Sequence, residues 1–208
     1  MPSAAAPDLL TADDLLRLHS QGVRGELVRG LLHETMSSGI RHGKIAVRLS
    51  AKLFNFVEPR RLGTLVGSDS GVWLERDPDT VREPDLAFFS AEVMPLDADI
   101  PGYAEVTPVL VAEIRSPSDS LRHVAERAAM WLSHGVSLVW IVHPETRSVD
   151  VHRAGRPVSV IADNGTLDGG EVLEGFSCNL AEIFDAWPLS AQPAAGQVRC
   201  RPNPLSAE

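Results

Sequence analysis

The sequence has 208 residues, a length typical of one domain, and its 44% hydrophobic and 23% charged residues are those of an ordinary globular protein. This composition excludes collagen-like, coiled-coil and wholly disordered chains. The 19 Lys and Arg residues against 28 Asp and Glu residues give a formal net charge of −9, which argues against nucleic-acid binding through bulk positive charge but not against a local basic cleft. Only Lys44 and Lys52 are lysines, so chemistry that needs a lysine has two places to use.

The distribution of apolar and charged residues indicates no targeting signal. No apolar run approaches the ~20 residues of a membrane span, and Asp8, Asp13 and Asp14 lie where a signal peptide would be basic and then apolar. Cys178 and Cys200 do not have the spacing of a metal cluster, so we interpret both as incidental thiols. We expect a cytoplasmic protein without membrane contact.

The chain is predicted to hold one domain over residues 11–186, after a frayed N-terminus at 1–10 and before a proline-rich, disordered tail at 187–208. Thr11 and Asp14 have the spacing of a capping box, which predicts a helix through His19. Residues 26–34 then read as a hairpin around Arg29-Gly30. Apolar residues recur at helical intervals from 40 to 57, which predicts an amphipathic helix that ends before Pro59.

The rest of the chain alternates short strands with helices. Strands are predicted at 64–66, 72–74, 85–89 and 109–114, with a turn at 76–80. Ser and Asp residues at 116–119 are natural N-caps for a helix that Gly135 ends, and a buried-type strand follows at 138–142. Strands at 149–152 and 158–161 and a short helix near 180–184 complete the pattern. The strand–helix–strand unit over 109–142 predicts an α/β fold, of mixed α+β character, with a mixed central sheet flanked by helices.

Two carboxylates lie where a fold alone would not place them. Asp85 opens one apolar strand and Glu113 interrupts another, where an unpaired charge would cost several kcal/mol of desolvation. A divalent cation would explain both positions, because Mg²⁺ is commonly held by one or two carboxylates together with water and phosphate oxygens. An ordinary structural explanation stays open: Asp85 caps a turn, and Glu113 pairs with Arg115 or Arg127.

Four segments carry a recognisable pattern in a fixed order: Glu26-Leu27-Val28-Arg29-Gly30-Leu31-Leu32, Arg82-Glu83-Pro84-Asp85-Leu86-Ala87-Phe88, Val111-Ala112-Glu113-Ile114-Arg115-Ser116-Pro117-Ser118-Asp119, and Gly135-Val136 before the strand that ends at His143-Pro144. Together they resemble the Uma-two family of restriction-endonuclease-like proteins, a branch of the PD-(D/E)XK nuclease superfamily. The resemblance runs from about Leu10 to Phe184.

The resemblance implies a restriction-endonuclease-like fold and hydrolysis of a DNA phosphodiester at a Mg²⁺ site, with Mn²⁺ as a possible substitute. Its metal ligands would be Asp85, Glu113 and the main-chain carbonyl of Ile114. The superfamily's lysine positions correspond to Arg115 and, in this branch, to Arg127 on the following helix. Arginine supplies charge and two-pronged phosphate contacts, but it stays protonated and cannot act as a base. Both arginines would therefore clamp phosphate in place of lysine.

Further residues match positions of the family, and each also has an ordinary structural interpretation. Glu26 would be an auxiliary carboxylate or an exposed hairpin residue, and His42 a site residue or a solvated histidine at a helix start. Arg127 lies at the edge of its helix's apolar stripe, so it leans toward the strand end or covers its neighbours. The strip of Arg41, His42, Lys44 and Arg48 would bind nucleic acid, or form a solvated helix face.

The leading hypothesis is thus a bacterial-type, Mg²⁺-dependent DNA endonuclease, for which a homodimer is plausible because cutting two strands usually takes two sites. The absence of a lysine at either expected position motivates a second hypothesis, a catalytically inert binding or scaffold module with the same fold. A third is a metal-dependent hydrolase of another phosphoester.

Overall fold

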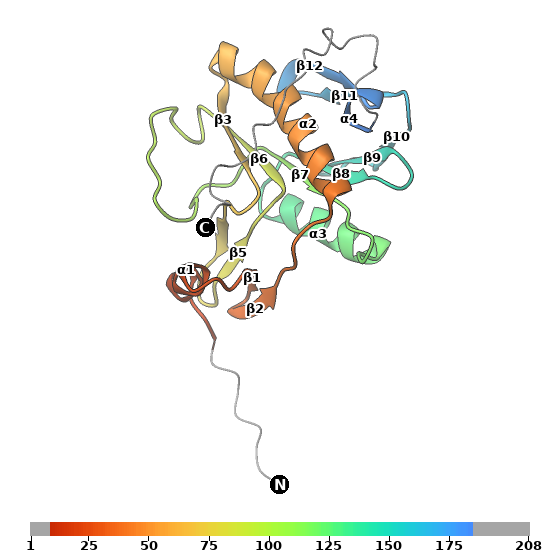
Figure 1. The fold of residues 1–208 in the computed structure, drawn as a ribbon. Helices are drawn as coiled ribbons and strands as arrows, with labels where there is room; N and C mark the ends of the chain where they lie inside the picture. The colour runs from red at the N-terminus through yellow and green to blue at the C-terminus, as the bar shows by residue number, and fades with distance from the viewer. Residues whose placement is uncertain (1–8, 185–208) are drawn as a thin grey trace, which may run out of the picture.

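A six-stranded mixed sheet forms the centre of the computed structural model, which describes residues 9–184 (Figure 1). Its spatial order is β10-β9-β8-β7-β6-β3. Neighbouring strands are antiparallel except β7 and β8, which are parallel and are joined by α3. The strands are β3 (Gly63–Gly67), β6 (Leu86–Ser90), β7 (Leu110–Ile114), β8 (Leu138–His143), β9 (Ser148–Arg153) and β10 (Ser159–Ile161). The predicted mixed sheet is confirmed.

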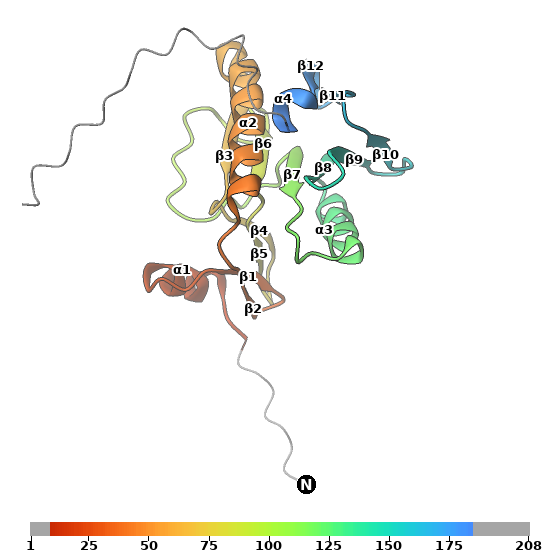
Figure 2. The same ribbon diagram turned by 45° about the vertical axis from the view of Figure 1, so that its right-hand side comes forward.

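Helices cover both faces of this sheet, as turning the molecule shows (Figure 2). The apolar stripe of α2 (Ile40–Val57), with Leu49 and Leu53 fully buried, packs against Leu86, Phe88 and other side chains of one face. On the opposite face, α3 (Leu121–Ser133) buries Trp131 in a second cluster that includes Val111 and Val139. Successive residues of a strand point to opposite faces, so nearly continuous apolar strands such as β7 and β8 supply both layers.

A second sheet lies beside the first and contributes to the site described below. It has the order β2-β1-β5-β4, with β1 (Gly25–Val28), β2 (Leu31–Glu34), β4 (Val72–Glu75) and β5 (Thr80–Arg82). Helix α1 (Ala12–Ser20) packs on it through Leu15, which joins Leu27 and Val81 in a separate small core. A hairpin of β11 (Thr166–Gly169) and β12 (Leu173–Asn179) and helix α4 (Ala181–Phe184) add to the α2 side of the central core.

The structure confirms most predicted elements and corrects several. The capping box of Thr11 and Asp14, the hairpin, the helix over 40–57 and the short helix near 180–184 are present. The predicted turn over 76–80 was wrong at its end, because Thr80 opens β5. The N-cap of α3 is Ser120, whose hydroxyl accepts the amide of His123, and not a residue of 116–119. Strands β11 and β12 were not predicted.

Two further expectations meet the structure only in part. No helix within residues 9–184 is long and apolar enough to cross a membrane. The predicted tail at 187–208, and residues 1–8 of the predicted frayed terminus, lie outside the described residues.

Candidate active site

The two predicted carboxylates lie next to each other across the central sheet. Strands β6 and β7 pair Leu86 with Ala112, and extending that antiparallel register by one residue places Asp85 opposite Glu113. Directly opposed residues of an antiparallel pair have Cβ atoms about 4.5–5.5 Å apart. The neighbouring strands therefore hold the pair together although 27 residues separate the two in the sequence.

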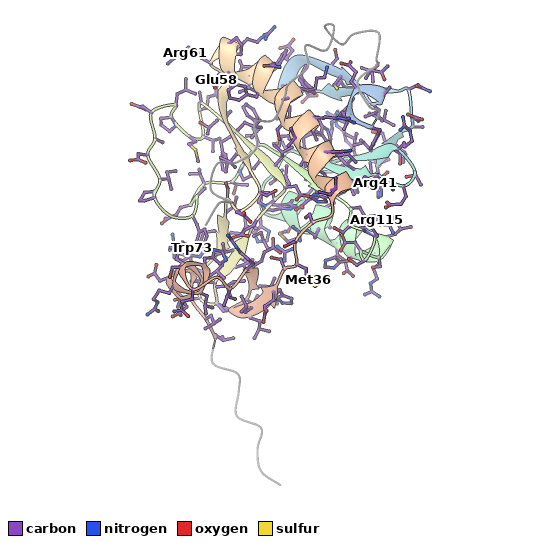
Figure 3. All side chains as sticks on the ribbon, viewed as in Figure 1. Met36, Arg41, Glu58, Arg61, Trp73 and Arg115 are labelled. Atoms are coloured by element: carbon purple, nitrogen blue, oxygen red, sulfur yellow. The ribbon has the colours of Figure 1, made fainter. Side chains whose placement is uncertain are left out.

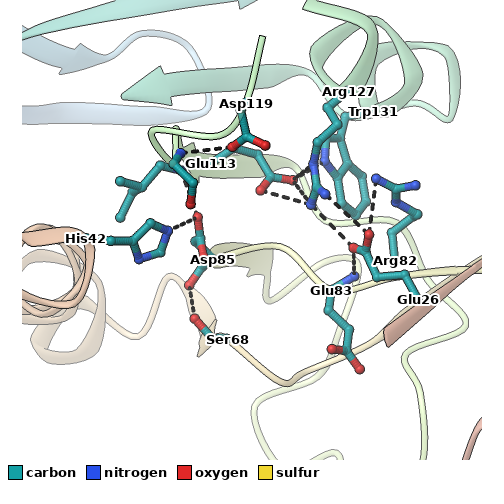
Figure 4. A network of polar contacts seen from close by, with 12 residues as sticks. Glu26, His42, Ser68, Arg82, Glu83, Asp85, Glu113, Asp119, Arg127 and Trp131 are labelled. Carbon is teal, nitrogen blue, oxygen red and sulfur yellow. Dashed lines mark hydrogen bonds and ion pairs between the residues drawn. The ribbon is translucent and has the colours of Figure 1, made fainter. Parts of the chain in front are cut away.

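Asp85 is held from the α2 side and by the backbone of β7 (Figure 4). Its Oδ2 accepts the main-chain amide of Ile114 at 2.7 Å and contacts Nε2 of His42 at 3.1 Å. Burial by itself would lower the pKa of His42, but Asp85 and the Ile114 carbonyl together raise that pKa above its ordinary value. His42 is thus a buried partner of Asp85, and its interpretation as a solvated helix-start histidine was wrong.

Glu113 is almost completely buried and is held from α3. Its Oε1 accepts Nη2 of Arg127 at 2.9 Å and Nε1 of Trp131 at 2.7 Å, and its Oε2 accepts Nη2 of Arg127 at 3.1 Å. Burial raises the pKa of Glu113, while Arg127 acts in the opposite direction. Of the two ion pairs considered for Glu113, the structure shows the one with Arg127.

Arg127 also reaches across to the second sheet. Its Nη1 and Nη2 each lie 3.3 Å from a carboxylate oxygen of Glu26 on β1. Glu26 is in turn paired with Arg82 of β5 at 3.2 Å and accepts the amide of Glu83 at 2.8 Å. Glu26 is only 3% exposed, so the alternative of an exposed hairpin carboxylate was wrong. Glu26, Arg127 and Glu113 form one continuous chain of contacts (Figure 4).

The other predicted site residues lie around this centre. Arg115 donates from Nε to the Asp119 carbonyl at 3.0 Å and makes no hydrogen bond or ion pair with Glu113. Arg41 and Lys44 are exposed on α2, and Arg48 is half-buried. His42 therefore stands apart from the basic residues with which it was grouped, because it alone of the four turns inward.

Three residues at the site were not among the predicted ones: Trp131, Arg82 and Glu83. A signal for Trp131 was present, because it follows Arg127 by four residues and the two therefore share a helix face. Glu83 has a pKa raised to about 7, chiefly by burial and then by Glu26 and Asp69, with Arg24 opposing. Its Oε1 lies 3.6 Å from Nε2 of His19 on α1.

The donor set is compatible in chemistry with a hard divalent cation. Asp85 keeps Oδ1 without a hydrogen-bond partner among the described residues, and carboxylate oxygens are the ligands that Mg²⁺ prefers. Residues 9–184 contain no group of three or more His, Cys, Asp or Glu side chains suited to a metal ion. A cation here would therefore depend on two carboxylates and on water, which is usual for Mg²⁺.

Comparison with known proteins shows the family of the chain. Residues 12–181 match the family described as "Putative restriction endonuclease". The chain belongs to the Uma2 family. Among curated proteins, none matches this Uma2 chain significantly.

A solved structure supports the architecture. The crystal structure described as a putative nuclease belonging to DUF820 from Anabaena variabilis superposes with a TM-score of 0.73 at 19% identity, covering 84% of this chain and 97% of that one. At this identity the likeness concerns the fold alone. It agrees with the nuclease-like mixed sheet expected from the sequence.

Proposed function

We propose that this Uma2 protein is a nuclease that hydrolyses a phosphodiester bond of DNA with a divalent cation, Mg²⁺ or Mn²⁺, held by Asp85, Glu113 and the Ile114 carbonyl. The observation that carries the proposal is the juxtaposition of Asp85, which directly precedes β6, and Glu113 of β7 in a chain of this family. When bound, the cation would supply a Lewis acid and an activated water.

The residues of the chain would bind and orient the substrate around that pair. Asp85 is oriented by the Ile114 amide and by His42, so its free Oδ1 has a defined direction. Arg115 uses only Nε within the described residues, so its terminal nitrogens are available for a phosphate oxygen. Arg127 is engaged with Glu113 and Glu26, and its charge would act on the phosphate from that fixed position.

Plasmid nicking at increasing Mg²⁺ and Mn²⁺ tests this function. We expect Asp85→Asn and Glu113→Gln each to lower the nicking rate at least about 100-fold, since loss of even an outer partner of a metal ligand costs 10–100-fold. Asp99→Asn, which changes an exposed acid in the loop before β7, controls for the charge change and for contaminating nucleases. Equal nicking by all four proteins would refute the proposal.

A second function is favoured by one observation. Both oxygens of Glu113 already accept hydrogen bonds from Arg127 or Trp131, so a cation must compete with protein donors. An inert nucleic-acid-binding module would keep this closed arrangement. Calorimetry with Mn²⁺ distinguishes the two: heat of binding in the wild type that Glu113→Gln removes favours the nuclease, whereas no heat in either protein favours the inert module.

A further inference from the structure

A hollow of about 380 Å³ lies between α2, the turn after β8 and α4. Arg41, Lys44, Arg48 and Arg147 line it, against a single acid, Glu145. Pro144 and Phe184 supply apolar wall. The hollow is therefore strongly positive in a chain whose net charge is −9.

Two of its cations have no side-chain partner among residues 9–184. Within residues 9–184, most Lys and Arg side chains make a hydrogen bond or an ion pair, and those that make neither are Arg29, Arg41, Lys44 and Arg61. Arg41 and Lys44 are three residues apart on α2, which makes them neighbours on the helix surface. Two adjacent positive charges without a counter-charge at this hollow would attract an anion.

The remaining basic side chains are fixed in place. Arg48 donates to the Ile183 carbonyl at 3.1 Å. Arg147 forms a two-pronged pair with Asp163 at 2.8 and 2.9 Å. These two form a rigid boundary, and Arg41 and Lys44 are the cations available to a ligand.

Helix α2 supplies residues both to the hollow and to the carboxylate site. His42, which contacts Asp85, lies between Arg41 and Lys44 in the sequence. From Arg41 to Lys44 the helix rises about 4.5 Å at 1.5 Å per residue. One DNA strand carries a phosphate about every 3.4 Å of duplex axis, so the two available cations are spaced for neighbouring phosphates.

We propose that this hollow, the α2 phosphate pocket, holds the sugar-phosphate backbone of a nucleic-acid strand within a few nucleotides of the bond at Asp85 and Glu113. The proposal rests on the proposed function for its placement. Charge-assisted hydrogen bonds from Arg41 and Lys44 to non-bridging phosphate oxygens supply the binding, and they carry no sequence preference.

The test measures binding without cleavage. Fluorescence anisotropy of a labelled 30-base-pair duplex is recorded in EDTA over a series of NaCl concentrations, for the wild type, R41A/K44A and R29A/R61A. The last variant is the matched control, since it removes the two unpartnered arginines that lie away from the pocket; Arg61 is beyond the opposite end of α2 from Arg41 (Figure 3). We expect the slope of log K against log[NaCl] to become less negative by about 2 in R41A/K44A and to stay unchanged in R29A/R61A.

The outcomes separate this inference from the proposed function. A slope in R41A/K44A equal to that of the wild type overturns the pocket, as does absence of duplex binding by the wild type. Nicking by the wild type together with an unchanged slope leaves the nuclease function standing and the pocket refuted. A reduced slope without nicking supports the pocket and refutes the nuclease.

Discussion

At the residue scale, each carboxylate of the site accepts hydrogen bonds from groups of the protein. Asp85 has the Ile114 amide and His42, and Glu113 has Arg127 and Trp131. A buried carboxylate without such partners would cost several kcal/mol, so these contacts explain how the strands accommodate acids.

These acids could be predicted from the sequence, whereas most of their partners could not. Asp85 and Glu113 stand out because they interrupt apolar runs, which is a local property. Arg82 contacts Glu26 from a different strand, and His42 contacts Asp85 across 43 residues. Such pairs depend on how sheets and helices pack, and no spacing in one segment reports that packing.

Trp131→Phe should lower the free energy of unfolding by more than the smaller ring alone would. The substitution removes the Nε1 donor to Glu113 and leaves a buried acceptor with one partner fewer, at a cost of about 1–3 kcal/mol. Trp140→Phe is the matched control, because Trp140 is equally buried and its Nε1 has no hydrogen-bond partner among the described residues. Urea unfolding measures both, and equal losses would contradict the role given to Trp131.

At the scale of elements, local signals decided what could be predicted. Helix α2 has 18 residues, about five turns, with an apolar stripe that includes Ile45, Leu49 and Leu53. The hairpin of β1 and β2 turns at Arg29-Gly30, where both residues have positive φ. Strand β5 is three residues long and follows a turn rich in Asp and Pro, so it gives no alternation to detect. Its existence depends on pairing with β1 and β4, which is non-local.

The start of α3 provides a test of the corrected cap. Ser120→Ala removes the hydroxyl that accepts the amide of His123, and we expect a loss of about 1 kcal/mol in the free energy of unfolding. Ser118→Ala is the control, because Ser118 is exposed and makes no cap hydrogen bond. A loss in Ser118→Ala as large as in Ser120→Ala would show that the helix begins where the sequence alone suggested.

At the scale of the whole molecule, the site joins the two sheets. Glu26 of the small sheet and Glu113 of the central sheet both bind Arg127, and Glu83 connects the segment before Asp85 to α1 through His19. Under the proposed function, the substrate would lie next to a junction that includes both sheets, α1 and α3.

Stability should depend on pH through this junction. The pKa of Glu83 is about 7 in the folded protein and 4.5 in a free chain, so between these values the folded state binds more protons and stability falls as pH rises. Relative to Glu83→Gln, the wild type should lose about 1–2 kcal/mol between pH 5 and pH 8, after allowance for partial exposure of the carboxyl group.

Urea unfolding in EDTA over that pH range provides the measurement. The other charged and polar groups near this carboxyl are His19, Arg24, Glu26, Asp69 and Tyr103. Glu92→Gln, in the exposed loop after β6, serves as the control. If the pH curves of the wild type and Glu83→Gln run parallel, Glu83 is ionised at the same pH in the folded and unfolded chains.

The chain of contacts from Glu26 through Arg127 to Glu113 affects whether folding requires a metal ion. In small zinc domains the ion is the counter-charge that permits folding. Here arginine side chains supply that counter-charge from within the polypeptide. Under the proposed function, the fold would therefore form before the cation arrives, and the supply of metal would govern catalysis without changing the amount of folded protein.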